Sequence, residues 1–178
     1  FNNLFVPFRC VASDVAAQHK VVHATGPLGE AVRSSMSFPI VFQPIRMNGA
    51  LLYDGGIFDN FPVDVMKEDF APDFMLGVTV NSGTHGPQTS LYDQIDNLVT
   101  RQQHSVVPPK KGIRIAVNAH QFGLLDWGKA QDIYTMGYNT TMAMMDSIKG
   151  RIHTRRPRIA VETARGAFRS QTPYLRFD

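Results

Sequence analysis

The sequence predicts an α/β fold with three layers, in which a mostly parallel sheet is covered by helices on both faces. Apolar runs of strand length, over 74–80 and 112–117, alternate with segments whose apolar residues recur every three or four positions. Near-continuous apolar runs are typical of strands that are covered on both faces. Stretches rich in glycine and proline separate these segments and predict the turns between them.

The composition is that of a globular domain. A chain of 178 residues is long enough for one domain with a buried core. The charged fraction of 19% is slightly low, which fits a piece whose surface partly packs against something else. No apolar run approaches the roughly 18 residues needed to span a bilayer. The single cysteine, Cys10, cannot form an internal disulfide, and its apolar neighbours predict a buried thiol.

The first half of the chain alternates between strand and helix patterns. We expect a strand over 4–15 and a short strand over 20–24 that pairs with it in a hairpin. A short helix is expected over 30–37, stopped by Pro39, and a second one over 62–70 with proline in its first turn. The serines of the first helix are predicted to be packing positions rather than nucleophiles, because no neighbouring base is evident in the sequence.

The second half continues the alternation, with strands predicted over 74–80 and 112–117, helices over 91–104 and 129–149, and loops over 81–89 and 120–128. The helix over 129–149 has the clearest apolar face. Its methionines are predicted to be core residues, with an adaptable acyl-chain groove as the alternative; they are Met136, Met142, Met144 and Met145. The sole tryptophan, Trp127, is expected to anchor its loop by packing rather than to contact lipid.

Basic residues gather at the end of the chain. From Lys149 onward, eight basic residues stand against two acidic ones, a net charge of +6, whereas the whole chain carries +3. No aromatic residues are interleaved in the manner of a nucleic-acid module, so no nucleic-acid partner is predicted. Two interpretations stay open: attraction to an anionic membrane surface, or a solvated and partly helical tail.

The candidate site lies in the stretch 51–63. An apolar run leads to Asp54, which is followed by the pair Gly55 and Gly56, and a second turn contains Asn60. Glycine pairs allow close backbone approach, and a carboxylate after a buried strand lies where α/β folds place their chemistry. The alternative is a turn in which Asp54 only bonds its own backbone. We expect Asn60 to brace the turn through its side chain rather than to act in catalysis.

A longer pattern surrounds this stretch. A helix end with small residues, Pro39, a Val-Phe pair and a second proline precede the Asp-Gly-Gly turn at Asp54 and the Asn-x-Pro turn at Asn60. This order resembles the C-terminal half of the patatin-like phospholipase domain. The resemblance extends over residues 1–150, which leaves 151–178 as a basic tail or a connector to a following domain.

The resemblance implies a lipid acyl hydrolase that uses a Ser-Asp dyad. In such enzymes a serine attacks the ester carbonyl of a lipid or other ester, and the aspartate takes the serine's proton directly. Asp54 matches the dyad aspartate, while Gly55, Gly56 and Asn60 would support the turn. Burial of a carboxyl group raises its pKa toward that of a useful general base. The alternative is a non-catalytic lipid-binding or scaffold relative of the same fold.

Two motifs of the family are absent from this sequence. One is the Gly-x-Ser-x-Gly elbow that carries the nucleophile, and the other is an early glycine-rich loop that binds the oxyanion. None of the nine serines has the flanking glycines. Because both motifs precede the aspartate in the family, we expect the serine to lie in a missing N-terminal half of the same domain. Such a chain should expose a sheet edge and apolar surface.

Cofactors are not predicted. The histidines and the single cysteine give little support to a zinc site, and no nucleotide-binding glycine loop is present. The sequence leaves the lipid class open, and also the oligomeric state, a homodimer included. The alternating residues 172–178 resemble the connector that precedes the outer-membrane region of some bacterial relatives, which would place the protein at the bacterial cell envelope.

Overall fold

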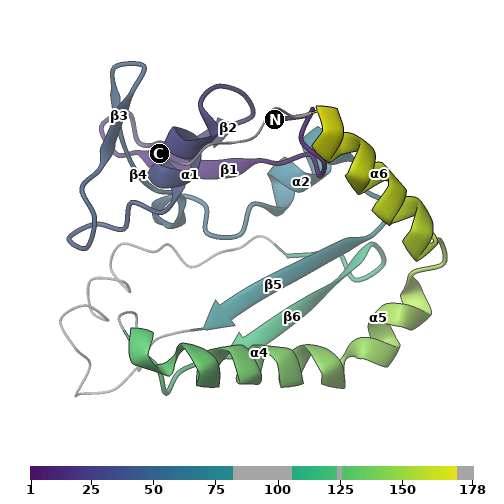
Figure 1. Cartoon of the computed structure of the whole chain (residues 1–178). Coiled ribbons are helices and arrows are strands. Elements are labelled where there is room, and N and C mark those ends of the chain that lie inside the picture. The colour runs from purple at the N-terminus through teal and green to yellow at the C-terminus, as the bar shows by residue number, and fades with distance from the viewer. Residues whose placement is uncertain (82–105, 124–125, 172–178) are drawn as a thin grey trace.

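The computed structural model describes residues 1–81, 106–123 and 126–171. It contains a four-stranded sheet covered by a short helix, and a separate pair of strands with a long helix on its far side (Figure 1). The α/β class predicted from the sequence is therefore confirmed.

The four-stranded sheet is antiparallel throughout, in the order β2-β1-β4-β3, and its strands are β1 (Cys10–Asp14), β2 (His19–His23), β3 (Ile45–Met47) and β4 (Ala50–Asp54). The hairpin expected between the first two strands is confirmed. The strand expected over 4–15 begins only at Cys10, since Pro7 cannot donate a ladder hydrogen bond.

A tight turn joins β3 to β4. Asn48 and Gly49 both have positive φ values, 49° and 84°. Two such residues suit the two-residue hairpin turn whose twist matches that of the flanking strands. The Asn-Gly pair is a strong hairpin signal in the sequence.

The two helices of the first half form close to the predicted positions. Helix α1 (Leu28–Ser35) covers β1 and β4 and buries Ala31 and Ser34. Helix α2 (Val63–Phe70) buries Val63 and Val65. It ends at Ala71, whose left-handed backbone lets its N–H bond the carbonyl of Lys67.

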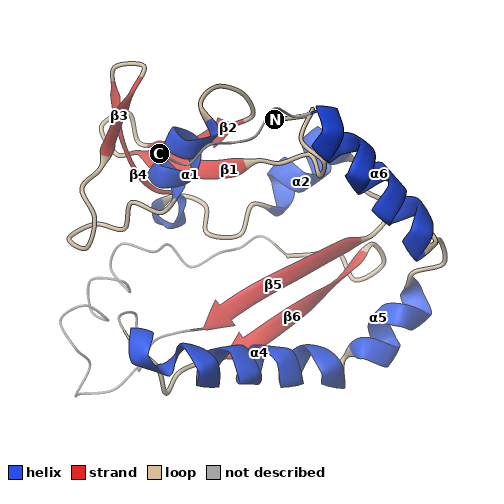
Figure 2. Cartoon of the chain, in the orientation of Figure 1, coloured by secondary structure: helices blue, strands red, loops and turns tan. Residues whose placement is uncertain are grey.

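Strands β5 (Met75–Asn81) and β6 (Gly112–Asn118) are parallel and lie between two layers (Figure 2). On one face, helices α4 (Ala130–Ala143) and α5 (Met145–Arg151) cover a core formed by Ile113, Ile115, Val117 and Ile148. On the other face, Phe61 and Val63 pack against Met75 together with Val107. The predicted helix over 129–149 is thus two helices that meet at Met144.

Two expectations about the sheet need correction. A mostly parallel sheet was expected, but among the described strands only β5 and β6 pair in parallel, because the strands before them are joined in sequence as hairpins. Strand β5 was expected to be covered on both faces. Instead Leu76, Val78 and Val80 are 50%, 55% and 57% exposed. They share a face with the core residues of β6, and the helix on that face packs over β6.

The end of the described chain is helix α6 (Arg158–Gln171), which agrees with a partly helical tail. A short 3-10 turn, η2 (Trp127–Lys129), precedes α4. Trp127 is 72% exposed, so the packing role expected for it is wrong. The helix expected over 91–104 and the tail over 172–178 lie outside the described residues. None of the helices in the described ranges is long and apolar enough to cross a membrane.

Candidate active site

Asp54 is the last residue of β4, and its side chain begins the turn that follows. Its carboxylate oxygen Oδ1 accepts a hydrogen bond from the Gly56 N–H at 2.8 Å. This contact caps the 3-10 turn η1 (Gly55–Ile57). The side chain is half-buried. Asp54 therefore makes the turn contact that an Asp-Gly pair favours, and it presents a carboxylate at the end of a strand.

Gly55 lies against the neighbouring strand. A Cβ atom built on Gly55 would sit 2.3 Å from the carbonyl oxygen of Val11 in β1. The hydroxyl of Ser13 also reaches this turn, where its Oγ donates to the Gly55 carbonyl at 3.4 Å. Only glycine lets the backbone pass β1 at this distance, and its position keeps Asp54 paired with Ala12 across the two strands.

Gly56 lies between two polar side chains. A Cβ atom built on Gly56 would sit 3.1 Å from Oδ1 of Asp54 and 3.2 Å from Oδ1 of Asn60. Two aspartate side chains accept hydrogen bonds in this turn: Oδ1 of Asp54 accepts from the Gly56 N–H, and Oδ1 of Asp59 accepts from the Phe61 N–H at 3.3 Å. The backbone N–H groups of Phe58 and Asp59 also donate to the Gly55 carbonyl. Asn60 is exposed and places its amide beside Gly56.

The helix end that precedes Pro39 and the Asp-Gly-Gly turn, which are separate parts of the sequence pattern, meet at Asp54. The backbone N–H of Asp54 donates to the carbonyl of Ser37 at 3.0 Å, just beyond the end of α1. Ser37 is fully buried, and its Oγ donates to the carbonyl of Arg33 at 2.7 Å. Residues 17 positions apart in the sequence thus lie side by side, and the helix end fixes the position of the aspartate.

An ion cluster formed by Lys20, Asp59 and Asp64 holds the far side of the turn, and we call it the Lys20 cluster. The Lys20 Nζ donates to Oδ2 of Asp59 at 2.7 Å and also to Asp64. Burial lowers the pKa of Lys20, but the two carboxylates outweigh this effect and the net pKa is raised. The hydrogen bond from Lys20 lowers the pKa of Asp64. The sequence pattern does not predict this cluster, because its members come from β2, the turn and α2.

The sequence pattern also does not predict a buried polar contact between His23 and Ser34. The Nε2 of His23 lies 3.0 Å from Oγ of Ser34, which donates its own proton to the carbonyl of Ala31 at 2.8 Å. The hydroxyl has one proton, so the imidazole must donate its Nε2–H to Ser34. Ser34 is completely buried, which closes it to a substrate. For Ser34, the buried position therefore favours the predicted packing role over the role of a nucleophile.

Metal-ligating side chains do not converge in the described ranges, where no three of His, Cys, Asp and Glu are grouped to hold an ion. His19 and His23 are four residues apart, a spacing that suits a metal on a helix. They stand on strand β2 instead, where a four-residue separation spans roughly 13 Å.

Comparisons with known proteins agree with this part of the structure. Residues 6–67 match the model of the patatin-like phospholipase family. This segment runs from before β1 into α2 and contains the whole Asp54 turn together with the helix end that fixes it. The resemblance seen in the sequence is therefore confirmed over 6–67, where the chain is similar to the patatin-like phospholipase family.

Three relatives extend the comparison. An uncharacterised NTE family protein of Mycobacterium tuberculosis is 37% identical over 82 residues, which are 46% of this chain and 22% of that protein. The patatin-like phospholipase domain-containing protein ZK370.4 of Caenorhabditis elegans is 33% identical over 98 residues, or 54% of this chain and 7% of that protein. The lysophospholipase NTE1 of Meyerozyma guilliermondii is 26% identical over 166 residues, or 76% of this chain and 12% of that protein. The chain spans less than a quarter of the length of each.

Proposed function

We propose that this chain supplies the aspartate of a lipid acyl hydrolase site, with Asp54 as the general base. The observation that carries the proposal is the bond between the Asp54 N–H and the Ser37 carbonyl at 3.0 Å. It joins the two motifs of the family pattern inside the segment that matches the patatin-like phospholipase model. A half-buried carboxylate held at a strand end is suited to accept a proton from a hydroxyl group.

In this proposal the carboxylate of Asp54 takes the proton of a serine hydroxyl as the serine oxygen bonds the ester carbonyl carbon. Collapse of the tetrahedral intermediate breaks the bond to the alcohol, which leaves with the proton returned from Asp54. Water then repeats the sequence on the acyl-serine: it gives its proton to Asp54, and the fatty acid is released as the serine regains a proton. Gly55 and Gly56 keep side chains away from the reacting groups.

We place the nucleophile in a segment outside this sequence, the N-terminal half of the same domain. The sequence supports this placement, since no serine has the glycine flanks of a nucleophile elbow. The exposed stripe on β5 also supports it. Leu76, Val78 and Val80 form an exposed apolar row on β5, which pairs only with β6 among the described strands. In this proposal residues 1–150 belong to the catalytic domain and 151–178 follow it.

The test is the variant Asp54→Asn in the full-length gene product, assayed for hydrolysis of lysophosphatidylcholine and a short-chain nitrophenyl ester. Loss of the base should reduce turnover by about 10²-fold or more. Asp73→Asn, at an exposed aspartate after α2, is the matched control and should keep full activity. Unfolding curves of both variants must coincide with the parent, so that the loss is chemical. Unchanged turnover in Asp54→Asn would refute the proposal.

The alternative function is a lipid-binding or scaffold role without catalysis. The observation that favours it is the bond from the Gly56 N–H to Asp54, which gives the carboxylate a structural task in the turn. A fluorophosphonate probe separates the two functions, because it labels only an activated serine. Labelling of the full-length protein at a serine outside this sequence supports the hydrolase, and no labelling supports the scaffold. Labelling within residues 1–178 would contradict a site divided between two segments.

A further inference from the structure

Arg33, in the last turn of α1, joins the end of this helix to the loop that follows it. Its Nη1 donates to Oγ of Ser37 at 2.6 Å, and its Nη2 donates to the carbonyl of Gln43 at 3.1 Å. The guanidinium carbon lies 5.3 Å from the centre of the Phe42 ring. The ion pairs among the described residues involve other side chains, so the partners of Arg33 are neutral. A planar guanidinium with its fork of donors can hold two such acceptors at once.

Ser37 connects Arg33 to Asp54. The Ser37 Oγ accepts a hydrogen bond from the Arg33 guanidinium and donates to the Arg33 carbonyl at 2.7 Å. The Ser37 carbonyl accepts from the Asp54 N–H at 3.0 Å. Ser37 is fully buried, and both its side chain and its carbonyl are therefore held. A continuous series of hydrogen bonds thus runs from the guanidinium to the backbone of the aspartate, and a shift of Ser37 moves Asp54 with it.

Ile40, which lies in the loop between the two acceptors of Arg33, has a strained backbone. Its φ is 74°, an outlier for a β-branched residue. The side chain is 69% exposed, so its own burial does not hold this conformation. Strain of this kind persists only where surrounding contacts fix the backbone, and it gathers at functional sites. Arg33 supplies such contacts on both sides of Ile40, at Ser37 and at Gln43. Removal of the guanidinium therefore frees the loop to relax.

We propose that Arg33 is a positioning residue for Asp54: its guanidinium fixes Ser37 and the loop after α1, and so sets where the carboxylate of Asp54 meets the serine hydroxyl. This inference rests on the proposed function and adds a residue that acts through Ser37. A general base works only within hydrogen-bond reach of the proton that it takes. A displacement of about 1 Å can cost on the order of 10²-fold in rate. Loss of the guanidinium should therefore lower kcat and leave KM close to that of the parent.

The experiment measures kcat and KM of the full-length gene product on a short-chain nitrophenyl ester. Arg33→Gln should reduce kcat by about tenfold or more, with KM within about twofold of the parent. Arg33→Lys keeps the charge but lacks the planar fork, so it should recover part of the loss. In Arg33→Ala, millimolar guanidinium chloride should raise kcat again, and the same concentration of sodium chloride should not. Turnover is counted per folded molecule, with the folded fraction taken from urea unfolding curves.

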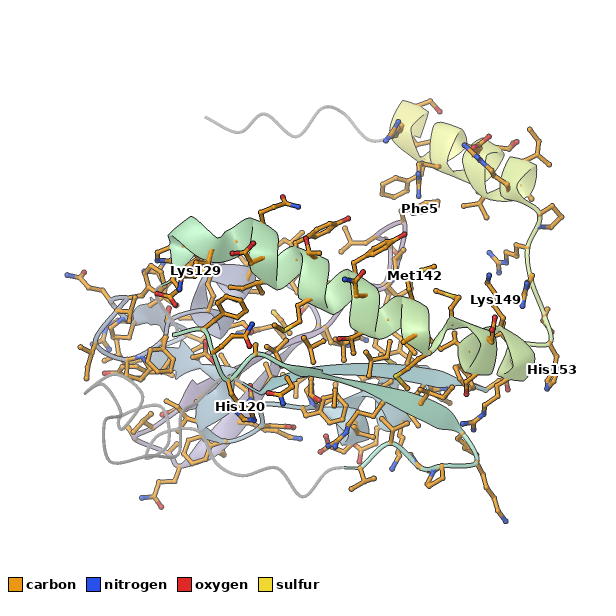
Figure 3. The ribbon with its side chains drawn as sticks, turned by 90° about the horizontal axis from the view of Figure 1, so that it is seen from below. Phe5, His120, Lys129, Met142, Lys149 and His153 are labelled. Carbon is orange, nitrogen blue, oxygen red and sulfur yellow. The ribbon has the colours of Figure 1, made fainter. Side chains whose placement is uncertain are left out.

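The matched control is Arg151→Gln, at another half-buried arginine with the same kind of contacts. Arg151 donates to two backbone carbonyls, one of them at 3.0 Å, and its guanidinium carbon lies 5.3 Å from the centre of the Phe74 ring. Figure 3 shows this end of α5, at Lys149 and His153. None of these contacts involves the four-stranded sheet that carries Asp54. Arg151→Gln should therefore lose stability and keep the parental kcat.

The outcomes separate this inference from the function on which it rests. If Asp54→Asn abolishes turnover while Arg33→Gln keeps the parental kcat, the hydrolase stands and the positioning role is refuted. If Asp54→Asn keeps its turnover, the proposed function fails first. An equal loss of kcat in Arg33→Gln and Arg151→Gln, or a loss that neither lysine nor guanidinium reverses, would also overturn the positioning role. If Arg33→Gln does not fold, Arg33→Lys takes its place in the comparison, and a parental kcat in that variant counts against the role.

Discussion

Lys20 Nζ donates to Oδ2 of Asp59 at 2.7 Å, and this contact ties β2 to the turn that follows Asp54. The Asp59 side chain is 7% exposed, whereas that of Lys20 is 30% exposed. The carboxylate is therefore withdrawn from water, and the lysine is one of its partners. The aspartate proposed as general base is thus fixed from two sides, by Ser37 at its backbone and by Lys20 through the turn.

We predict that Lys20→Met lowers the free energy of unfolding by about 1–3 kcal/mol, since it removes the ammonium group that donates to the buried Asp59 carboxylate. Urea unfolding followed by circular dichroism measures the change. Lys67→Met, at an exposed lysine of α2 outside the Lys20 cluster, is the control and should stay within about 0.5 kcal/mol of the parent. Equal effects of the two substitutions would show that the cluster does not stabilise the turn.

The buried imidazole of His23 makes stability depend on pH. Burial lowers the pKa of His23 below its ordinary value of 6.5. As the pH falls through 6.5, the unfolded chain takes up a proton at this histidine before the folded chain does. The contribution of the neutral imidazole to the free energy of unfolding is therefore fully present above pH 6.5 and declines below it. His23→Gln, whose amide can still donate to Ser34, should remove this decline between about pH 7 and pH 5.

The control for this titration is His153→Gln, at an exposed histidine. It should retain the parent's decline in stability as the pH is lowered, measured by urea unfolding at a series of pH values. If His23→Gln and the parent lose stability in parallel across this range, the titrating group is another residue.

The close approach of Gly55 to β1 predicts a sharp response to a single methyl group. Gly55→Ala places a Cβ atom 2.3 Å from the Val11 carbonyl oxygen, and backbone must move to relieve the clash. We expect a loss of about 3 kcal/mol or more in the free energy of unfolding. Gly137→Ala in α4 has open space and should instead add about 0.5–1 kcal/mol. A loss below 1 kcal/mol at Gly55 would mean that the turn relaxes freely.

The sequence by itself determined the α/β class, most helices and strands to within a few residues, and the family resemblance confirmed over 6–67. These features depend on local sequence. Apolar periodicity predicts α2 and β6, and three consecutive residues, Asp-Gly-Gly, predict the turn at Asp54. The same local logic predicted β5 as a doubly covered strand, because its run of apolar residues is continuous whether or not anything covers it.

Only the tertiary structure decided which distant residues meet. Lys20 reaches Asp59 and Asp64, His23 reaches Ser34, and the end of α1 reaches Asp54, over separations of 11 to 44 residues. The tertiary structure also left Trp127 and Ile159 exposed. No periodicity or spacing records such contacts, since they depend on how strands pair and where helices dock. Hydrophobic pattern specifies which side of an element is apolar, and packing alone decides what that side meets.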